Sequence, residues 1–90
     1  MTKKEIKQFA KENHINLKNN DFVVEYTTRL TNDVEYDICK HWFEKWFKDF
    51  DQAKDFFDEV ASKYYNVSLR TWVGNSIVYL DDCDSWENWK

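Results

Sequence analysis

The chain has 90 residues, a net charge of −4 and an aromatic content of 19%, with one glycine and no proline. This length suits one domain, whose small core gains from the large apolar area that each aromatic side chain buries. The first residues are polar and no apolar run is long enough to cross a bilayer, which argues against a signal peptide or a membrane partner; we expect a cytoplasmic protein.

The charge is unevenly distributed along the chain. Residues 1–20 carry five Lys against two Glu, whereas residues 31–60 carry nine acids against four Lys and residues 81–90 carry four acids against one Lys. An acidic surface repels nucleic acid and attracts basic proteins. We therefore expect a protein partner with a basic surface and no direct binding of nucleic acid.

The first two predicted elements are a helix over residues 3–13 and a strand over residues 22–30. Thr2 and Glu5 have the spacing of a capping box, and the apolar residues that follow recur with a helical period. The strand is rich in β-branched and aromatic residues and alternates between its two faces, which is typical of a strand half buried against helices.

Two further helices are predicted over residues 34–49 and 52–65. In the first, the apolar positions fall within half of a helical wheel. Asp49 with Gln52, or Asp51 alone, can cap the second. Residues 34–38 also alternate as a strand does. A hairpin with the preceding strand, followed by a helix from near Cys39, is therefore an alternative.

The last predicted elements are two strands, over residues 67–73 and 76–80. They flank a Gly-Asn pair, which is a strong indication of a type II′ hairpin. That turn fixes which residues face each other, and the aliphatic side of the hairpin is expected to meet the helices. The expected pairs are Arg70 with Tyr79, Trp72 with Ile77, Thr71 with Val78, and Leu69 with Leu80.

Together these elements predict an α+β fold in the order α-β-α-α-β-β. A small antiparallel sheet of about three strands would pack on helices as a pair of layers. Residues 1–80 would form one compact domain, and residues 81–90 an acidic tail that contains tryptophan.

The residues of the chain indicate no catalytic or metal site. Cys39 and His41, two positions apart on a predicted helix, would point to different sides of it. One glycine cannot build a phosphate-binding loop, and the acids near residues 81–84 lack the spacing of a calcium-binding loop. We expect no enzyme, no cofactor and no metal. Both cysteines, Cys39 and Cys83, are expected to be free thiols in a reducing compartment, with a single disulfide between them as the alternative.

Three surfaces are candidates for binding a partner. The acidic outer face of the third predicted helix has carboxylates at a spacing similar to that of DNA phosphates, so it could mimic nucleic acid; its residues are Asp51, Asp55, Asp58 and Glu59. The outer hairpin face combines residue types that dominate binding hot spots; its residues are Arg70, Trp72, Ile77 and Tyr79. The tail combines acids with tryptophans; its residues are Asp81, Asp82, Asp84, Trp86 and Trp89.

Each surface also has a purely structural interpretation. The helix face could be an ordinary solvated surface, the hairpin face could be covered by the first helix or the tail, and the tail tryptophans could fold back to close the core.

In overall character the chain is small, acidic and rich in aromatic residues, without catalytic apparatus. In this respect it is similar to inhibitors of host defence enzymes carried by phages and mobile elements, including anti-CRISPR proteins. The resemblance implies a non-enzymatic inhibitor that blocks a basic partner, such as a nuclease or another nucleic-acid-binding enzyme, in the host cytoplasm. The alternative is a homodimeric or larger structural or adaptor subunit that packs through its aromatic hairpin face.

Overall fold

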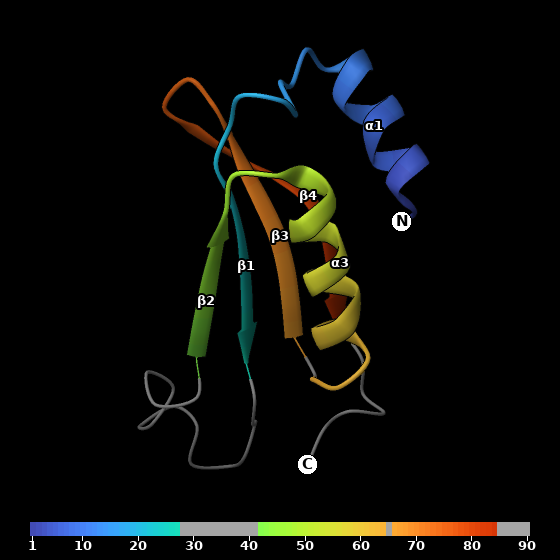
Figure 1. Ribbon diagram of the computed structural model, residues 1–90, viewed down its shortest axis with the longest axis vertical. Helices are drawn as coiled ribbons and strands as arrows, with labels where there is room; N and C mark the ends of the chain where they lie inside the picture. The colour runs from blue at the N-terminus through green and yellow to red at the C-terminus, as the bar shows by residue number, and fades with distance from the viewer. Residues whose placement is uncertain (28–41, 65, 85–90) are drawn as a thin grey trace.

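The computed structural model describes residues 1–27, 42–64 and 66–84. Within these residues the chain is a small α+β domain, as predicted, with a sheet of four antiparallel strands in the order β2-β1-β3-β4 (Figure 1). The elements are α1 (Lys3–Glu12), β1 (Phe22–Thr27), β2 (Trp42–Phe47), α3 (Phe50–Ala61), β3 (Asn66–Val73) and β4 (Ser76–Asp84).

Helix α1 begins and ends with local hydrogen bonds. The predicted capping box is present, because Thr2 and Glu5 each accept a hydrogen bond from the other's backbone N–H. After the helix, His14 has a positive φ of 57°. The backbone N–H of Ile15 then donates to the carbonyl of Ala10 at 2.8 Å, the bond that closes a Schellman motif.

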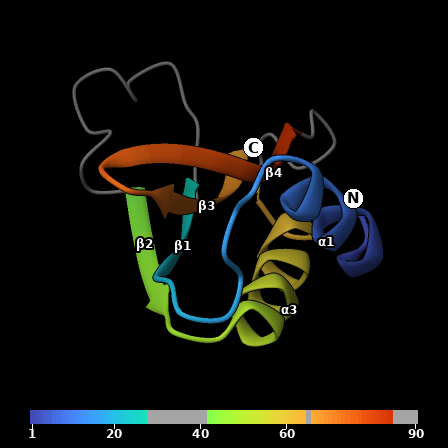
Figure 2. The ribbon, with the colours of Figure 1, turned by 90° about the horizontal axis from the view of Figure 1, so that it is seen from above.

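Both helices cover one face of the sheet. Seen from above, α1 and α3 lie on the same side of the curved sheet (Figure 2), with α3 against β1 and β3 and α1 against β4. The apolar residues between the layers form one core, whose buried members are Ile6, Ala10, Ile15, Phe22, Val24, Phe50, Ala53, Phe57, Val60, Val67, Leu69 and Leu80.

The prediction of a helix over residues 34–49 is wrong for residues 42–47, which form strand β2. The strand pairs antiparallel with β1, from Phe22 opposite Phe47 to Thr27 opposite Trp42. Its aromatic residues recur with the period of a helix, and the ladder with β1 nevertheless makes the segment a strand. The described chain therefore has the order α-β-β-α-β-β, with four strands where three were expected.

Strand β2 also contradicts the alternative of a helix from near Cys39. The strand proposed at residues 34–38 lies outside the described residues, as do residues 28–30 of the first predicted strand. Helix α3 starts at Phe50 and ends at Ala61, rather than spanning residues 52–65.

The boundary between β2 and α3 is set by Asp49. Its carboxylate accepts a hydrogen bond from the backbone N–H of Gln52 at 2.9 Å, which confirms Asp49 rather than Asp51 as the cap.

The predicted hairpin is present, but the pairing of its strands differs from the prediction beyond Arg70. Gly74 has a φ of 62° and Asn75 does not have a positive φ. This is the combination that a type II′ turn requires. The pairs Trp72–Ile77, Thr71–Val78 and Arg70–Tyr79 are confirmed. The pairing then shifts at a β-bulge, so the expected Leu69–Leu80 pair is wrong, and Leu69 lies opposite Asp81.

The bulge allows two successive side chains of β4 to point toward the helices. Leu80 and Asp81 are 2% and 9% exposed, whereas the residues on either side, Tyr79 and Asp82, are exposed. Strand β4 continues to Asp84, so it reaches four residues into the segment that was assigned to the tail.

Candidate functional site

The sheet face away from the helices is a continuous surface made by all four strands. The register aligns Trp46 of β2, Val23 of β1, Arg70 of β3 and Tyr79 of β4 in one row across the sheet. Alternation along each strand places these side chains on the same face. We call this surface the open face.

Two tryptophans cover the centre of the open face. The rings of Trp46 and Trp72 stack with their centroids 5.2 Å apart and an interplanar angle of 18°. Val23, which lies between their strands, is 0% exposed although no described helix covers it. The stacked indoles therefore bury the middle of the face and form a rigid aromatic platform.

The rim of this platform is exposed to solvent. Trp46, Ile77 and Tyr79 are 53%, 52% and 60% exposed, the largest fractions among the apolar side chains of the described sheet. Helix α1 packs on the same side of the sheet as α3 (Figure 2), so it does not cover the hairpin face. The alternative that α1 folds over this face is therefore wrong. The alternative that the tail covers this face falls on residues 85–90, which lie outside the described part.

Arg70 connects the aromatic and the charged parts of the face. Its guanidinium lies 5.9 Å from the ring centroid of Tyr79 and donates to the Glu25 carboxylate at 2.8 Å. Both charged side chains are mostly buried, at 15% and 17% exposure. This contact fixes the guanidinium between a ring and a carboxylate.

A row of carboxylates borders the aromatic platform. Glu25 pairs with Glu44 on one side and with Ser68 on the other, and Ser68 pairs with Asp82. The Trp46 Nε1–H donates to the Glu44 carboxylate at 3.2 Å, so this acid lies at the edge of the indole. The described part of the open face thus has three carboxylates and one guanidinium. The carboxylates are those of Glu25, Glu44 and Asp82.

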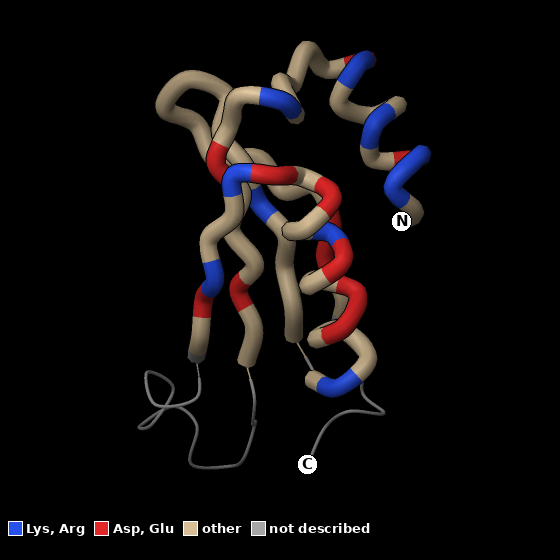
Figure 3. The backbone as a smooth tube through the Cα atoms, in the orientation of Figure 1, with Lys and Arg blue, Asp and Glu red and all other residues tan. Residues whose placement is uncertain are grey.

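The acids predicted on the third helix are exposed on α3, and lysines form ion pairs with them. Figure 3 shows the acidic positions along α3 and the basic positions along α1. Lys3 of α1 lies 2.8 Å from Asp55 and 3.7 Å from Asp51, and Lys7 lies 3.8 Å from Asp51. The hydrogen bond from Lys3 to the Asp55 carboxylate raises the pKa of that lysine, with burial opposing this effect.

The other two acids of α3 are paired within the helix. Glu59 lies 3.6 Å from Lys63 and Asp58 lies 2.5 Å from Lys54. Every acid of the predicted stripe therefore has a cation within 4 Å, and the stripe lacks the uncompensated charge of a nucleic-acid backbone.

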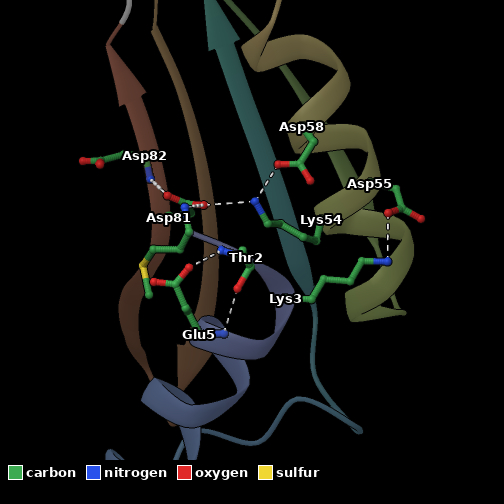
Figure 4. A network of polar contacts seen from close by, with 9 residues as sticks. Thr2, Lys3, Glu5, Lys54, Asp55, Asp58, Asp81 and Asp82 are labelled. Carbon is green, nitrogen blue, oxygen red and sulfur yellow. Dashed lines mark hydrogen bonds and ion pairs between the residues drawn. The ribbon is translucent and has the colours of Figure 1, made fainter.

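Asp81 was predicted as a partner-binding residue of the tail, and the structure places it inside the protein. Its carboxylate accepts from Lys54 Nζ at 3.1 Å and from the α-amino group of Met1 at 3.0 Å (Figure 4). The side chains of Lys54 and Asp81 are 3% and 6% exposed. This buried ion pair joins α3 to β4 and leaves Asp81 unable to meet a partner.

The remaining predicted residues fall into two groups. Arg70, Trp72, Ile77, Tyr79 and Asp82 come together on the open face, whereas the side chain of Asp84 and residues Trp86 and Trp89 lie outside the described part. The prediction missed Trp46, Glu44 and Glu25 as members of one surface. Alternation within residues 42–47, if read as a strand, would have found the first two.

Among the described residues, no group of side chains is arranged to hold a metal ion. Cys83 carries a free thiol, as predicted, while Cys39 lies outside the described residues. Neither described helix has the length and apolar character that a bilayer crossing demands. Comparison with known proteins finds no matching family model, no similar curated protein and no similar solved structure.

Proposed function

We propose that this protein is a non-enzymatic binding module that inhibits a basic, nucleic-acid-handling protein by occupying its surface. The observation that carries the proposal is the open face, where Trp46 and Trp72 form a rigid aromatic platform and Trp46, Ile77 and Tyr79 are exposed. Tryptophan, tyrosine and arginine supply most of the energy at protein interfaces, and a rigid platform loses little entropy on binding.

The charge of the protein supports a basic partner. The chain has a net charge of −4, and among the described residues of the open face the acids outnumber the one arginine. Complementary charge raises the rate of association and selects among partners. Because the acids of α3 are paired with lysines, we assign the attraction to the open face rather than to mimicry of DNA by the helix.

The proposed site of action is the cytoplasm, which for a phage or mobile-element inhibitor is that of the host cell. The free thiol of Cys83 supports a reducing compartment, since paired cysteines are typical of oxidising ones.

The test is a pull-down from cell lysate, followed by an assay of the identified partner. The double variant Ile77→Thr/Tyr79→Thr removes the exposed anchors and keeps good strand formers. The control Val73→Thr makes the same kind of change at an apolar side chain that is 42% exposed on the other side of β3. We expect only the double variant to lose the partner, and wild-type protein to block the partner's binding of nucleic acid. Retention by the double variant, or an uninhibited partner, would contradict the proposal.

The second candidate is a homo-oligomer that packs through the same face. The exposure of Ile77 and Tyr79 on a sheet surface favours it, because such surfaces often pair with a copy of themselves. Sedimentation at micromolar concentration separates the two candidates: a stable dimer that the Trp72→Ala change dissociates would establish the oligomer.

A further inference from the structure

We propose that the occupant of the open face is an arginine-containing segment of the partner, whose guanidinium groups stack on the exposed rings and pair with the bordering carboxylates. This inference rests on the proposed function and specifies the chemistry of the partner. It is based on the arrangement of Trp46 and Tyr79 beside Glu44 and Asp82.

The spacing between the exposed rings and the bordering carboxylates suits an arginine side chain. Trp46 and Glu44 are two residues apart on β2, which separates their backbones by roughly 7 Å along the strand. The hydrogen bond between the Trp46 indole and the Glu44 carboxylate brings the acid to the edge of the ring. A guanidinium lying over that ring can therefore reach the carboxylate, combining a cation–π contact with an ion pair.

The face already contains one example of this contact. Arg70 lies beside the Tyr79 ring and is bound to Glu25, so ring, guanidinium and carboxylate adjoin one another in this surface. Glu44 and Asp82 stand on either side of this centre. No described lysine or arginine forms an ion pair with either of them.

Charge distinguishes this occupant from the other possible ones. A nucleic acid would bring phosphates to a surface where carboxylates outnumber the only described cation, Arg70. A second copy would bring its own acidic row to the same surface. A cationic protein segment is the occupant whose charge complements the face.

The inference can be tested with short labelled peptides and purified protein. The probe is an eight-residue peptide in which Arg and Ser alternate, compared by fluorescence anisotropy with peptides that carry Lys or Gln in place of Arg. We expect the Arg peptide to bind, the Lys peptide to bind about threefold more weakly because its ammonium stacks less well, and the Gln peptide not to bind.

Two charge-matched variants locate the binding. Glu44→Gln/Asp82→Asn removes two negative charges from the open face, and Asp51→Asn/Asp55→Asn removes two from α3. We expect the first to weaken binding of the Arg peptide about tenfold and the second less than about twofold. Equal losses in both variants would show unspecific attraction and overturn the inference.

Other outcomes also decide against it. Binding of the Gln peptide, or tighter binding of a single-stranded DNA 12-mer, would overturn arginine recognition. Loss of the partner with Ile77→Thr/Tyr79→Thr but not with Glu44→Gln/Asp82→Asn would overturn arginine recognition alone and leave the proposed function standing. Retention with both variants would instead refute the proposed function.

Discussion

At the scale of single residues, the ion pair of Lys54 and Asp81 is the most demanding contact in the core. Both side chains are almost fully buried, so each charge needs compensation from nearby groups. Lys54 also pairs with Asp58, and Asp81 with the α-amino group of Met1. Lys54 also lies over the Phe57 ring, 4.8 Å from its centroid. Removing one partner of a buried pair is far more costly than replacing both with apolar groups.

We therefore predict that Asp81→Asn lowers the free energy of unfolding by about 3 kcal/mol. The exposed neighbouring change Asp82→Asn is the control and should cost less than about 0.5 kcal/mol. Urea denaturation of both variants measures the difference. Equal effects would mean that the Asp81 carboxylate contributes no more than a surface acid.

His14 occupies a backbone conformation that suits glycine better. Its φ of 57° crowds the Cβ atom against the backbone, which glycine avoids. We predict that His14→Gly raises the free energy of unfolding by about 0.5–1 kcal/mol, the gain being reduced by the greater freedom of glycine in the unfolded chain. His14→Ala keeps the Cβ atom and should give no gain. Thermal denaturation of both variants is the measurement, and a gain with alanine would rule out this explanation.

The residues of the candidate site differ in how far sequence predicts them. Arg70, Trp72, Ile77 and Tyr79 were placed on one face because a two-residue turn at Gly74 fixes the pairing near it. Asp81 could not be placed, because the pairing that the turn fixes ends at the bulge, and its partner Lys54 lies on a distant helix. Periodicity contains no information about such a partner.

At the scale of elements, Asp49 decides where a strand stops and a helix starts. Only Lys48 and Asp49 separate β2 from α3, so the cap also ends the ladder with β1. We predict that Asp49→Ala costs about 1 kcal/mol of stability, whereas Asp49→Ser, which keeps a capping oxygen, costs clearly less. Chemical denaturation measures both, and equal losses would argue against the cap as the cause.

Strand β2 shows why local pattern alone was insufficient at this scale. Its aromatic pairs recur with a helical period, yet in the sheet Phe43 stacks on Tyr26 and Trp46 stacks on Trp72, on opposite faces. Both contacts join residues far apart in the chain. Elements with their own end signals, such as α1 and the hairpin, were placed well, whereas β2 depended on its neighbour.

At the scale of the whole molecule, the docking of α1 depends on apolar burial more than on charge. Its lysines approach α3 at exposed positions, where ion pairs contribute little, whereas Ile6 is 0% exposed. We predict that Ile6→Ala costs about 3 kcal/mol and Lys3→Gln less than about 1 kcal/mol. Urea denaturation tests both, and the reverse order would show that charge holds the helix.

The division of the molecule into a helical side and an open side was predictable from the sequence. The alternation in residues 22–27 and the helical period in residues 53–60 each indicated one buried face, which is enough for an α+β pair of layers. The number and order of the strands could not be predicted from the sequence, because they depend on which segment completes the sheet.

The bulge in β4 also limits where related sequences can gain or lose residues. It makes the outward residues Tyr79 and Asp82 three positions apart, where a regular strand would separate them by two. Deletion of one residue at the bulge would remove Leu80 from the core. Insertion of one residue would turn the Asp81 side chain away from Lys54. In chains that share an ancestor with this one, insertions and deletions should therefore collect in the loops and spare residues 79–82.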